Sequence, residues 1–126
     1  MRYRILLVVL ALSVSLASVA LAAHPKKNAV YVGVWRDKTD KLSIHVSSTE
    51  RSGHAKLWCF KAFQGTSSRF AISRQGYFKA AYYFAGSLEW SARGHFTSRT
   101  TAVASVHLAI ACSGIGSARN LTLTLT

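Results

Sequence analysis

The side chains that could act as acids, bases or metal ligands are few and scattered along the chain. The 126 residues include four carboxylates (Asp37, Asp40, Glu50 and Glu89) and five histidines. Asp37 and Asp40 stand three apart in the basic segment Arg36–Lys41, which favours charge balance in a turn over an acid–base pair. No two histidines have a metal-ligand spacing, and G-x-S-x-G, H-E-x-x-H and phosphate-loop patterns are absent. We therefore predict a protein that is not an enzyme and needs no metal or cofactor.

The first residues have the pattern of a secretory signal peptide. Arg2 and Arg4 precede the apolar run Ile5–Leu12, and Ala20–Ala22 provides small residues at a cleavage site. The alternative is an uncleaved membrane anchor over Ile5–Ala23. Serines within this segment and the A-x-A ending favour cleavage. We therefore predict a signal peptide over 1–22, one domain over 23–126 and a secreted or cell-envelope location, with no integral membrane segment after cleavage.

The two cysteines fit this location. Cys59 and Cys112 are the only pair, and export favours their oxidation. A bond between them would close a loop of 53 residues (112 − 59), which corresponds to roughly 4 kcal/mol of loop-closure entropy. The alternative is a reactive thiol, but neither cysteine has a histidine at a recognisable spacing. The sequence favours a structural disulfide.

The charge of the chain is strongly positive. Sixteen Lys and Arg residues against four acidic ones give a formal net charge of +12. Removal of Arg2 and Arg4 leaves 14 against four, or about +10. Such a charge attracts polyanions and keeps copies of the protein apart. We expect a monomer whose partner is an anionic polymer or an acidic protein, with nucleic acid bound only non-specifically.

Basic and aromatic residues alternate in two segments. Lys56, Trp58 and Phe60 would share one face of a strand, and Tyr77, Lys79 and Tyr83 one face of another. Such mixtures bind sugars, nucleotides or acidic proteins. The alternative is a second core layer over which the lysine stems extend. The candidate ligand-binding residues are Lys56, Trp58, Lys61, Arg74, Tyr77, Lys79 and Tyr83.

The hydrophobic pattern after the signal has a period of two. The longest alternating run lies within Gly94–Ser117 and predicts a central strand with a hairpin on each side. A glycine at position 94 suggests a bulge in the preceding strand. We predict an all-β domain, a compact antiparallel β-sandwich or partly closed barrel of about eight strands. The expected strands cover Val30–Trp35, 42–47, His54–Phe63, Arg69–Ser73, Tyr77–Phe84, 88–96, 102–112 and 121–125.

Two short motifs carry resemblances. Gly94-His95-Phe96-Thr97-Ser98, followed by Cys112-Ser113-Gly114, resembles the C-terminal half of a group of small secreted bacterial β-sandwich domains. Ser105 departs from that pattern, in which a glycine is expected. The resemblance implies export and a β-sandwich, without an activity. Gly33-Val34-Trp35 is similar to the G-x-W opening of calycin-type barrels, whose first strand packs a tryptophan at the barrel floor.

These observations favour a secreted, non-catalytic binding module that engages an anionic extracellular or envelope partner through a basic-aromatic surface. Small disulfide-braced β-domains also serve as secreted protein inhibitors of enzymes, which is the main alternative. A calycin-like ligand-binding barrel or a hydrolase is the third class. A large apolar cavity behind Trp35 would favour the ligand barrel.

Overall fold

The computed structural model describes residues 23–126. After residue 29 the chain, with its alternating apolar and polar side chains, forms nine antiparallel strands. The predicted signal peptide, 1–22, lies outside the described residues. A single 3-10 turn, η1 (Ala111–Gly114), precedes the last strand. The strands are β1 (Val30–Trp35), β2 (Asp40–Val46), β3 (Ser52–Cys59), β4 (Ala62–Thr66), β5 (Phe70–Ala71), β6 (Tyr77–Phe84), β7 (Ser87–Phe96), β8 (Thr101–Leu108) and β9 (Ala118–Leu125).

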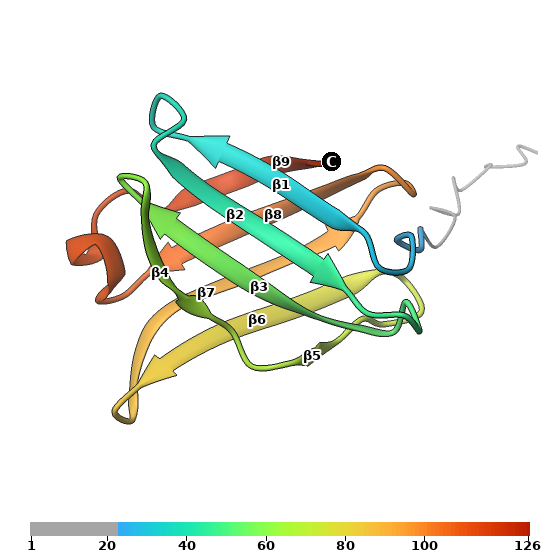
Figure 1. Ribbon diagram of the computed structural model, residues 1–126, viewed down its shortest axis with the longest axis horizontal. Helices are drawn as coiled ribbons and strands as arrows, with labels where there is room; N and C mark the ends of the chain where they lie inside the picture. Colours follow the sequence, from blue (N-terminus) through green and yellow to red (C-terminus); the bar gives the residue numbers. More distant parts are fainter. Residues whose placement is uncertain (1–22) are drawn as a thin grey trace, which may run out of the picture.

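The strands follow one another as a meander that nearly closes into a barrel. The sheet order is β4-β3-β2-β1-β9-β8-β7-β6, so the first strand pairs with both the second and the last. At the open seam, β5 pairs with β3, and the Ser68 N–H donates to the Ala81 carbonyl of β6 at 3.3 Å. Figure 1 shows β1–β3 as a front layer crossing over β6–β8 behind. The predicted all-β antiparallel fold is confirmed.

The core lies between these two layers. Inward side chains from both layers are fully buried, and Tyr31, Trp90 and Phe96 are the largest of them. The rings of Tyr31 and Phe96 meet edge to face, with 4.9 Å between centroids. Aromatic pairs of this kind contribute beyond their buried area. Aromatic side chains therefore fill the interior of the barrel.

One predicted strand is a hairpin. The chain reverses at Phe60 and Lys61, whose φ angles are 49° and 65°. Positive φ at both central residues is the geometry of a two-residue primed turn. The prediction of a continuous strand over His54–Phe63, with Phe60 beside Lys56 and Trp58, is therefore wrong.

The predicted central strand is present as β8 but is shorter than expected. β8 pairs with β7 and β9, so the predicted hairpin on each side is confirmed. The strand ends at Leu108, and Cys112 lies in η1 with a φ of 59°. The bulge expected at Gly94 is not there, because the pairing of β7 is regular across it. The glycine serves close approach instead, since a Cβ there would collide with backbone of Val103 and Ala104.

The disulfide ties the two layers together at one end of the barrel. Cys59, the last residue of β3, is bonded to Cys112 of η1, with their Cα atoms 5.7 Å apart. The predicted pairing is confirmed. Within residues 23–126, no helix has the length and apolar character that crossing a bilayer requires.

Candidate functional site

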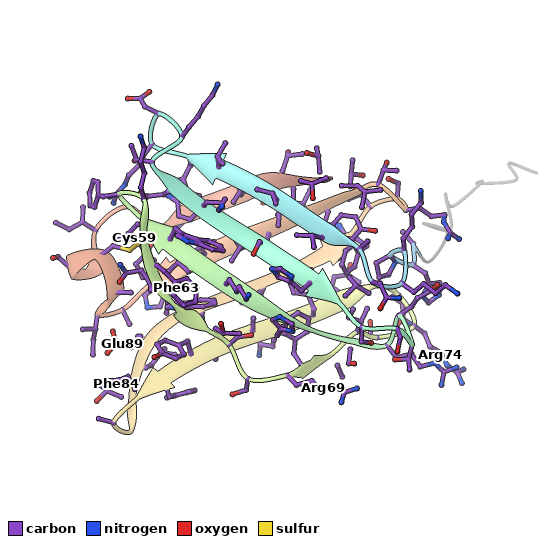
Figure 2. All side chains as sticks on the ribbon, viewed as in Figure 1. Cys59, Phe63, Arg69, Arg74, Phe84 and Glu89 are labelled. Carbon is purple, nitrogen blue, oxygen red and sulfur yellow. A yellow bond between two sulfur atoms is a disulfide. The ribbon has the colours of Figure 1, made fainter. Side chains whose placement is uncertain are left out.

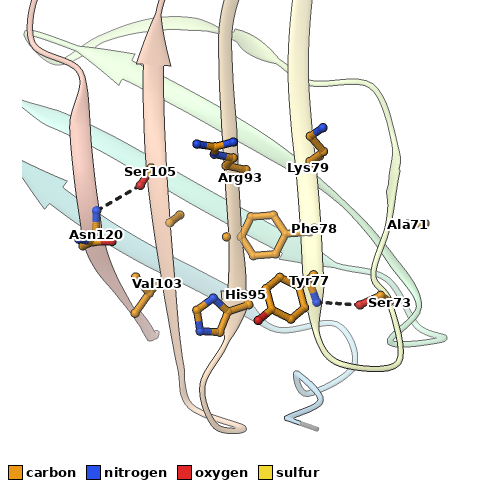
Figure 3. A pocket seen from close by; sticks show the side chains of 12 residues that line it. Ala71, Ser73, Tyr77, Phe78, Lys79, Arg93, His95, Val103, Ser105 and Asn120 are labelled. Carbon is orange, nitrogen blue, oxygen red and sulfur yellow. Dashed lines mark hydrogen bonds between the residues drawn. The ribbon is translucent and has the colours of Figure 1, made fainter. Parts of the chain in front are cut away.

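A groove of about 710 Å³ runs along the outer face of the back layer, across β6, β7, β8 and β9. Figure 3 shows its lining from close by, with outward side chains of four adjacent strands in rows. A second depression of about 830 Å³ continues it toward the other end of the same face and shares Lys79, Arg93 and Ser105 with it. Together they form one continuous surface, here called the back-face groove.

The centre of the back-face groove is a pair of adjacent cations. Lys79 of β6 lies directly opposite Arg93 of β7 in the strand register, and both side chains are exposed. No carboxylate is among the residues that line either part of the groove. Like charges directly opposite each other in a sheet destabilise it. An anion bound between Lys79 and Arg93 would relieve this repulsion.

An aromatic row lies beside the two cations. Tyr77 and His95, the next pair along the same strands, have ring centroids 5.0 Å apart. Tyr77 keeps 57% of its surface exposed, so a flat apolar face is open to a ligand. This combination of ring, cations and adjacent hydroxyl and amide groups suits an acidic sugar or another flat anionic unit.

The rim of the groove is held by hydrogen bonds to side chains. The Tyr77 N–H donates to the Ser73 hydroxyl at 3.0 Å, and the Asn120 N–H donates to the Ser105 hydroxyl at 3.3 Å. Both bonds are drawn in Figure 3. The second one lies where the β8–β9 register shifts, between Ala104 and Val106. The first bond closes the turn before β6, and the second joins β9 to β8.

The structure divides the predicted ligand-binding residues between two layers. Tyr77 and Lys79 line the first part of the back-face groove, and Lys79 and Tyr83 line the second. Arg74 is exposed in the turn before β6, outside the lining. Lys56 and Trp58 lie on β3 and Lys61 in the turn after it, all in the front layer. The predicted set therefore does not form one surface.

Several groove residues were not among the predicted ligand-binding residues: Arg93, His95, Ser105, Asn120 and Arg119. The alternation of β7 does place Arg93 and His95 on the outward side. Only the strand register shows that they stand beside Lys79 and Tyr77.

The aromatic residues of the front layer contact their own protein. The Lys41 ammonium lies 4.0 Å from the centroid of the Trp58 ring. Phe63, the partner of Trp58 on β4, has its ring centroid 5.3 Å from that of Trp58. Cation–π and ring contacts of this kind occupy the Trp58 surface. This part of the candidate surface therefore has an internal partner, unlike Lys79 and Arg93.

Two histidines meet on the front layer. His45 and His54 stack with 4.9 Å between centroids, and the His45 Nε2 lies 2.9 Å from the Ser43 hydroxyl. Burial lowers the pKa of both rings, and repulsion from Lys56 lowers it further; His54 also lowers the pKa of His45. Among the described residues, no group of three or more His, Cys, Asp or Glu could hold a metal ion.

The carboxylates do not converge on a site. Asp40 is fully buried at the start of β2 and forms an ion pair with the Arg36 guanidinium, with Nε 3.3 Å from Oδ2. Its other oxygen accepts the Phe60 N–H at 3.0 Å. The expected charge balance in this turn thus takes the form of a buried ion pair. Asp37 lies exposed in the turn itself.

Comparison with protein-family models, curated proteins and solved structures finds no match to this chain. The geometry of the barrel and its outer faces therefore carries the functional argument.

Proposed function

We propose that this protein is an exported, non-catalytic binding module that holds an anionic polymer in the back-face groove. The observation that carries the proposal is the Lys79–Arg93 pair, two exposed cations opposite each other with no carboxylate in the groove lining. A positive surface of this kind raises the local concentration of anionic partners and speeds their association. The net charge of the domain adds long-range attraction to the same effect.

The groove favours an acidic polysaccharide over a compact acidic protein. It is elongated, running over both parts with Lys79 and Arg93 at their junction. Tyr77 offers a stacking face, and the neighbouring hydroxyl and amide groups match sugar hydroxyls. We propose that one anionic group of the chain binds between Lys79 and Arg93 while an adjacent ring lies on Tyr77.

The alternatives receive less support. A calycin-like carrier would hold its ligand inside the barrel, where Tyr31, Trp90 and Phe96 are fully buried. The grooves described above open on the outer faces instead. An enzyme inhibitor would form a one-to-one complex of fixed stoichiometry, whereas several copies of this protein would bind along one polymer chain, and that binding weakens as salt screens the charges.

The test compares two charge reversals that change the net charge equally. Lys79→Glu/Arg93→Glu reverses the groove pair, and Lys56→Glu/Arg51→Glu reverses two front-layer residues. The protein used is residues 23–126, which contain all nine strands and the disulfide. Wild type and both variants are applied to an immobilised sulfated polysaccharide, and their affinities are compared. We expect the groove variant to lose affinity by at least about tenfold and the control to lose less than about threefold. Equal losses would show that net charge alone binds the polymer and would overturn the proposal.

A further inference from the structure

The exposed hydrophobic side chains gather at the end of the barrel that holds the disulfide. In an antiparallel meander, alternate connections meet at the same end, and here these are 36–39, 60–61, 85–86 and 109–117. Of the eight large hydrophobics that are exposed in the described part of the chain, all but Tyr77 lie in or within two residues of these connections. They are Val34, Phe60, Phe63, Tyr83, Phe84, Ile110 and Ile115. We call these seven residues the apolar end.

The arrangement is visible as a difference between the two ends of the molecule. Figure 1 shows all four connections on the left side of the barrel, and Figure 2 labels Cys59, Phe63 and Phe84 on that side, with Arg74 at the opposite end. The connections of that opposite end are polar, as in Ser48–Arg51 and Thr97–Thr100. Clusters of exposed apolar residues of this kind mark interaction sites, whereas scattered ones do not.

Phe60 is exposed at a cost to the backbone. It occupies the first position of a primed turn with a φ of 49°, where asparagine or glycine is preferred and an aromatic residue is rare. Its side chain is 65% exposed, and the Arg36 guanidinium lies 5.2 Å from the centroid of its ring, as a cation–π pair. Folding gains little from a phenylalanine here, so its presence indicates a surface role.

Three of the four connections of the apolar end, 36–39, 60–61 and 109–117, are fastened to one another. The disulfide links β3 to η1, and the Trp35 Nε1–H donates to the Gly116 carbonyl at 2.8 Å. The Lys61 N–H donates to the Thr39 carbonyl at 2.8 Å, which joins the first two turns. A surface held in this way loses little conformational entropy when it binds a partner.

The charges around the apolar end decide which partner fits it. Lys38 and Lys61 stand in the turns, and Lys41 and Arg119 lie one residue inside β2 and β9. The acidic residues at this end are Asp37, Glu89 and the buried Asp40, which is paired with Arg36. The surplus is positive, as it is for the whole domain. Two copies would therefore repel each other end to end, whereas an anionic surface would attract this end.

We propose that the apolar end docks on an anionic lipid bilayer. Phe60, Phe84 and Ile115, which are 65%, 64% and 67% exposed, would enter the headgroup region, and the surrounding lysines would contact anionic lipids. The barrel would then stand on the membrane without crossing it. The first part of the back-face groove, around Tyr77 and His95, lies away from the apolar end and would stay open in this orientation, whereas the second part reaches that end at Tyr83. This inference does not depend on what the groove binds.

The test measures binding of residues 23–126 to vesicles by sedimentation. Vesicles of phosphatidylcholine with about a third of phosphatidylglycerol are compared with pure phosphatidylcholine. The variant Phe60→Asn/Phe84→Ser removes two of the apolar tips, and asparagine also suits the turn at position 60. Tyr77→Ser is the matched control, because Tyr77 is similarly exposed away from the apolar end.

We expect the Phe60→Asn/Phe84→Ser variant to lose at least about tenfold in partitioning to anionic vesicles, and Tyr77→Ser to change it less than about twofold. Pure phosphatidylcholine should bind wild type at least about tenfold more weakly. Equal binding of wild type and the Phe60→Asn/Phe84→Ser variant would overturn the inference. A self-association that this variant abolishes, without vesicle binding, would also overturn it. Loss of vesicle binding in Lys79→Glu/Arg93→Glu alone would assign lipid to the groove instead.

Discussion

The buried pair of Asp40 and Arg36 offers the sharpest test of how the end of the barrel is built. Asp40 has no exposed surface; it forms an ion pair with the Arg36 guanidinium and accepts a hydrogen bond from the Phe60 N–H. Asp40→Ala would leave the guanidinium without an anion and the Phe60 N–H without its acceptor. It would also loosen the turn that carries Phe60.

The loss of unfolding free energy depends on how well water can solvate the Arg36 guanidinium once Asp40 is removed. Breaking a buried ion pair by removing one partner costs about 3–5 kcal/mol of unfolding free energy. Because the Arg36 side chain is still 22% exposed, we expect the lower end, about 3 kcal/mol. Asp40→Asn keeps an oxygen for the Phe60 N–H but loses the charge, so we expect about 1–2 kcal/mol.

Urea unfolding of the oxidised protein, followed by near-ultraviolet circular dichroism, measures these losses. A double-mutant cycle with Arg36→Ala isolates the interaction of the two side chains. We expect Asp40→Ala/Arg36→Ala to cost at least about 1 kcal/mol less than the sum of the single changes. Additive losses, or a loss below about 1 kcal/mol for Asp40→Ala, would refute the reasoning.

Two further predictions concern the cross-link and the histidine pair. Cys59→Ala/Cys112→Ala should lower the unfolding free energy by about 4 kcal/mol, because the loop of 53 residues is no longer closed in the unfolded chain. A loss below about 1 kcal/mol in denaturant titrations would contradict this. The pKa values of His45 and His54 are lowered below 6.5 in the folded state, so the unfolded chain binds more protons and stability should fall as pH drops from about 7.5 to 5.5. Between these two pH values, the unfolding free energy of the His45→Gln/His54→Gln variant should fall less than that of wild type. An equal fall in both proteins would contradict the prediction.

The alternation of side chains predicted most of the fold. The expected bounds of Val30–Trp35 and Tyr77–Phe84 are those of β1 and β6. The β3–β4 hairpin was missed because its turn residues, Phe60 and Lys61, are of types that do not mark a turn, unlike glycine, asparagine or proline. The predicted strand through Cys112 was too long, because the apolar residues after Leu108 continue the pattern after the backbone has left the sheet.

The candidate site was only half predictable. Strand periodicity placed Tyr77, Lys79 and Tyr83 on one outward face, where the structure has them lining the groove. It could not show that Arg93 lies opposite Lys79, because register depends on hairpin lengths and on shifts such as the one at Tyr82 and Tyr83. It also could not show that Lys56 and Trp58 belong to the other layer, since that depends on how the sheet curves and closes.

Binding of an anionic polymer in the back-face groove is tested most directly by a nuclear magnetic resonance titration of nitrogen-15-labelled residues 23–126 with a sulfated hexasaccharide. We expect the largest amide shift changes on Lys79, Arg93 and His95, with smaller ones extending along β6–β9. Changes centred on Lys56 and Trp58 in the front layer, or the absence of saturable changes, would contradict it.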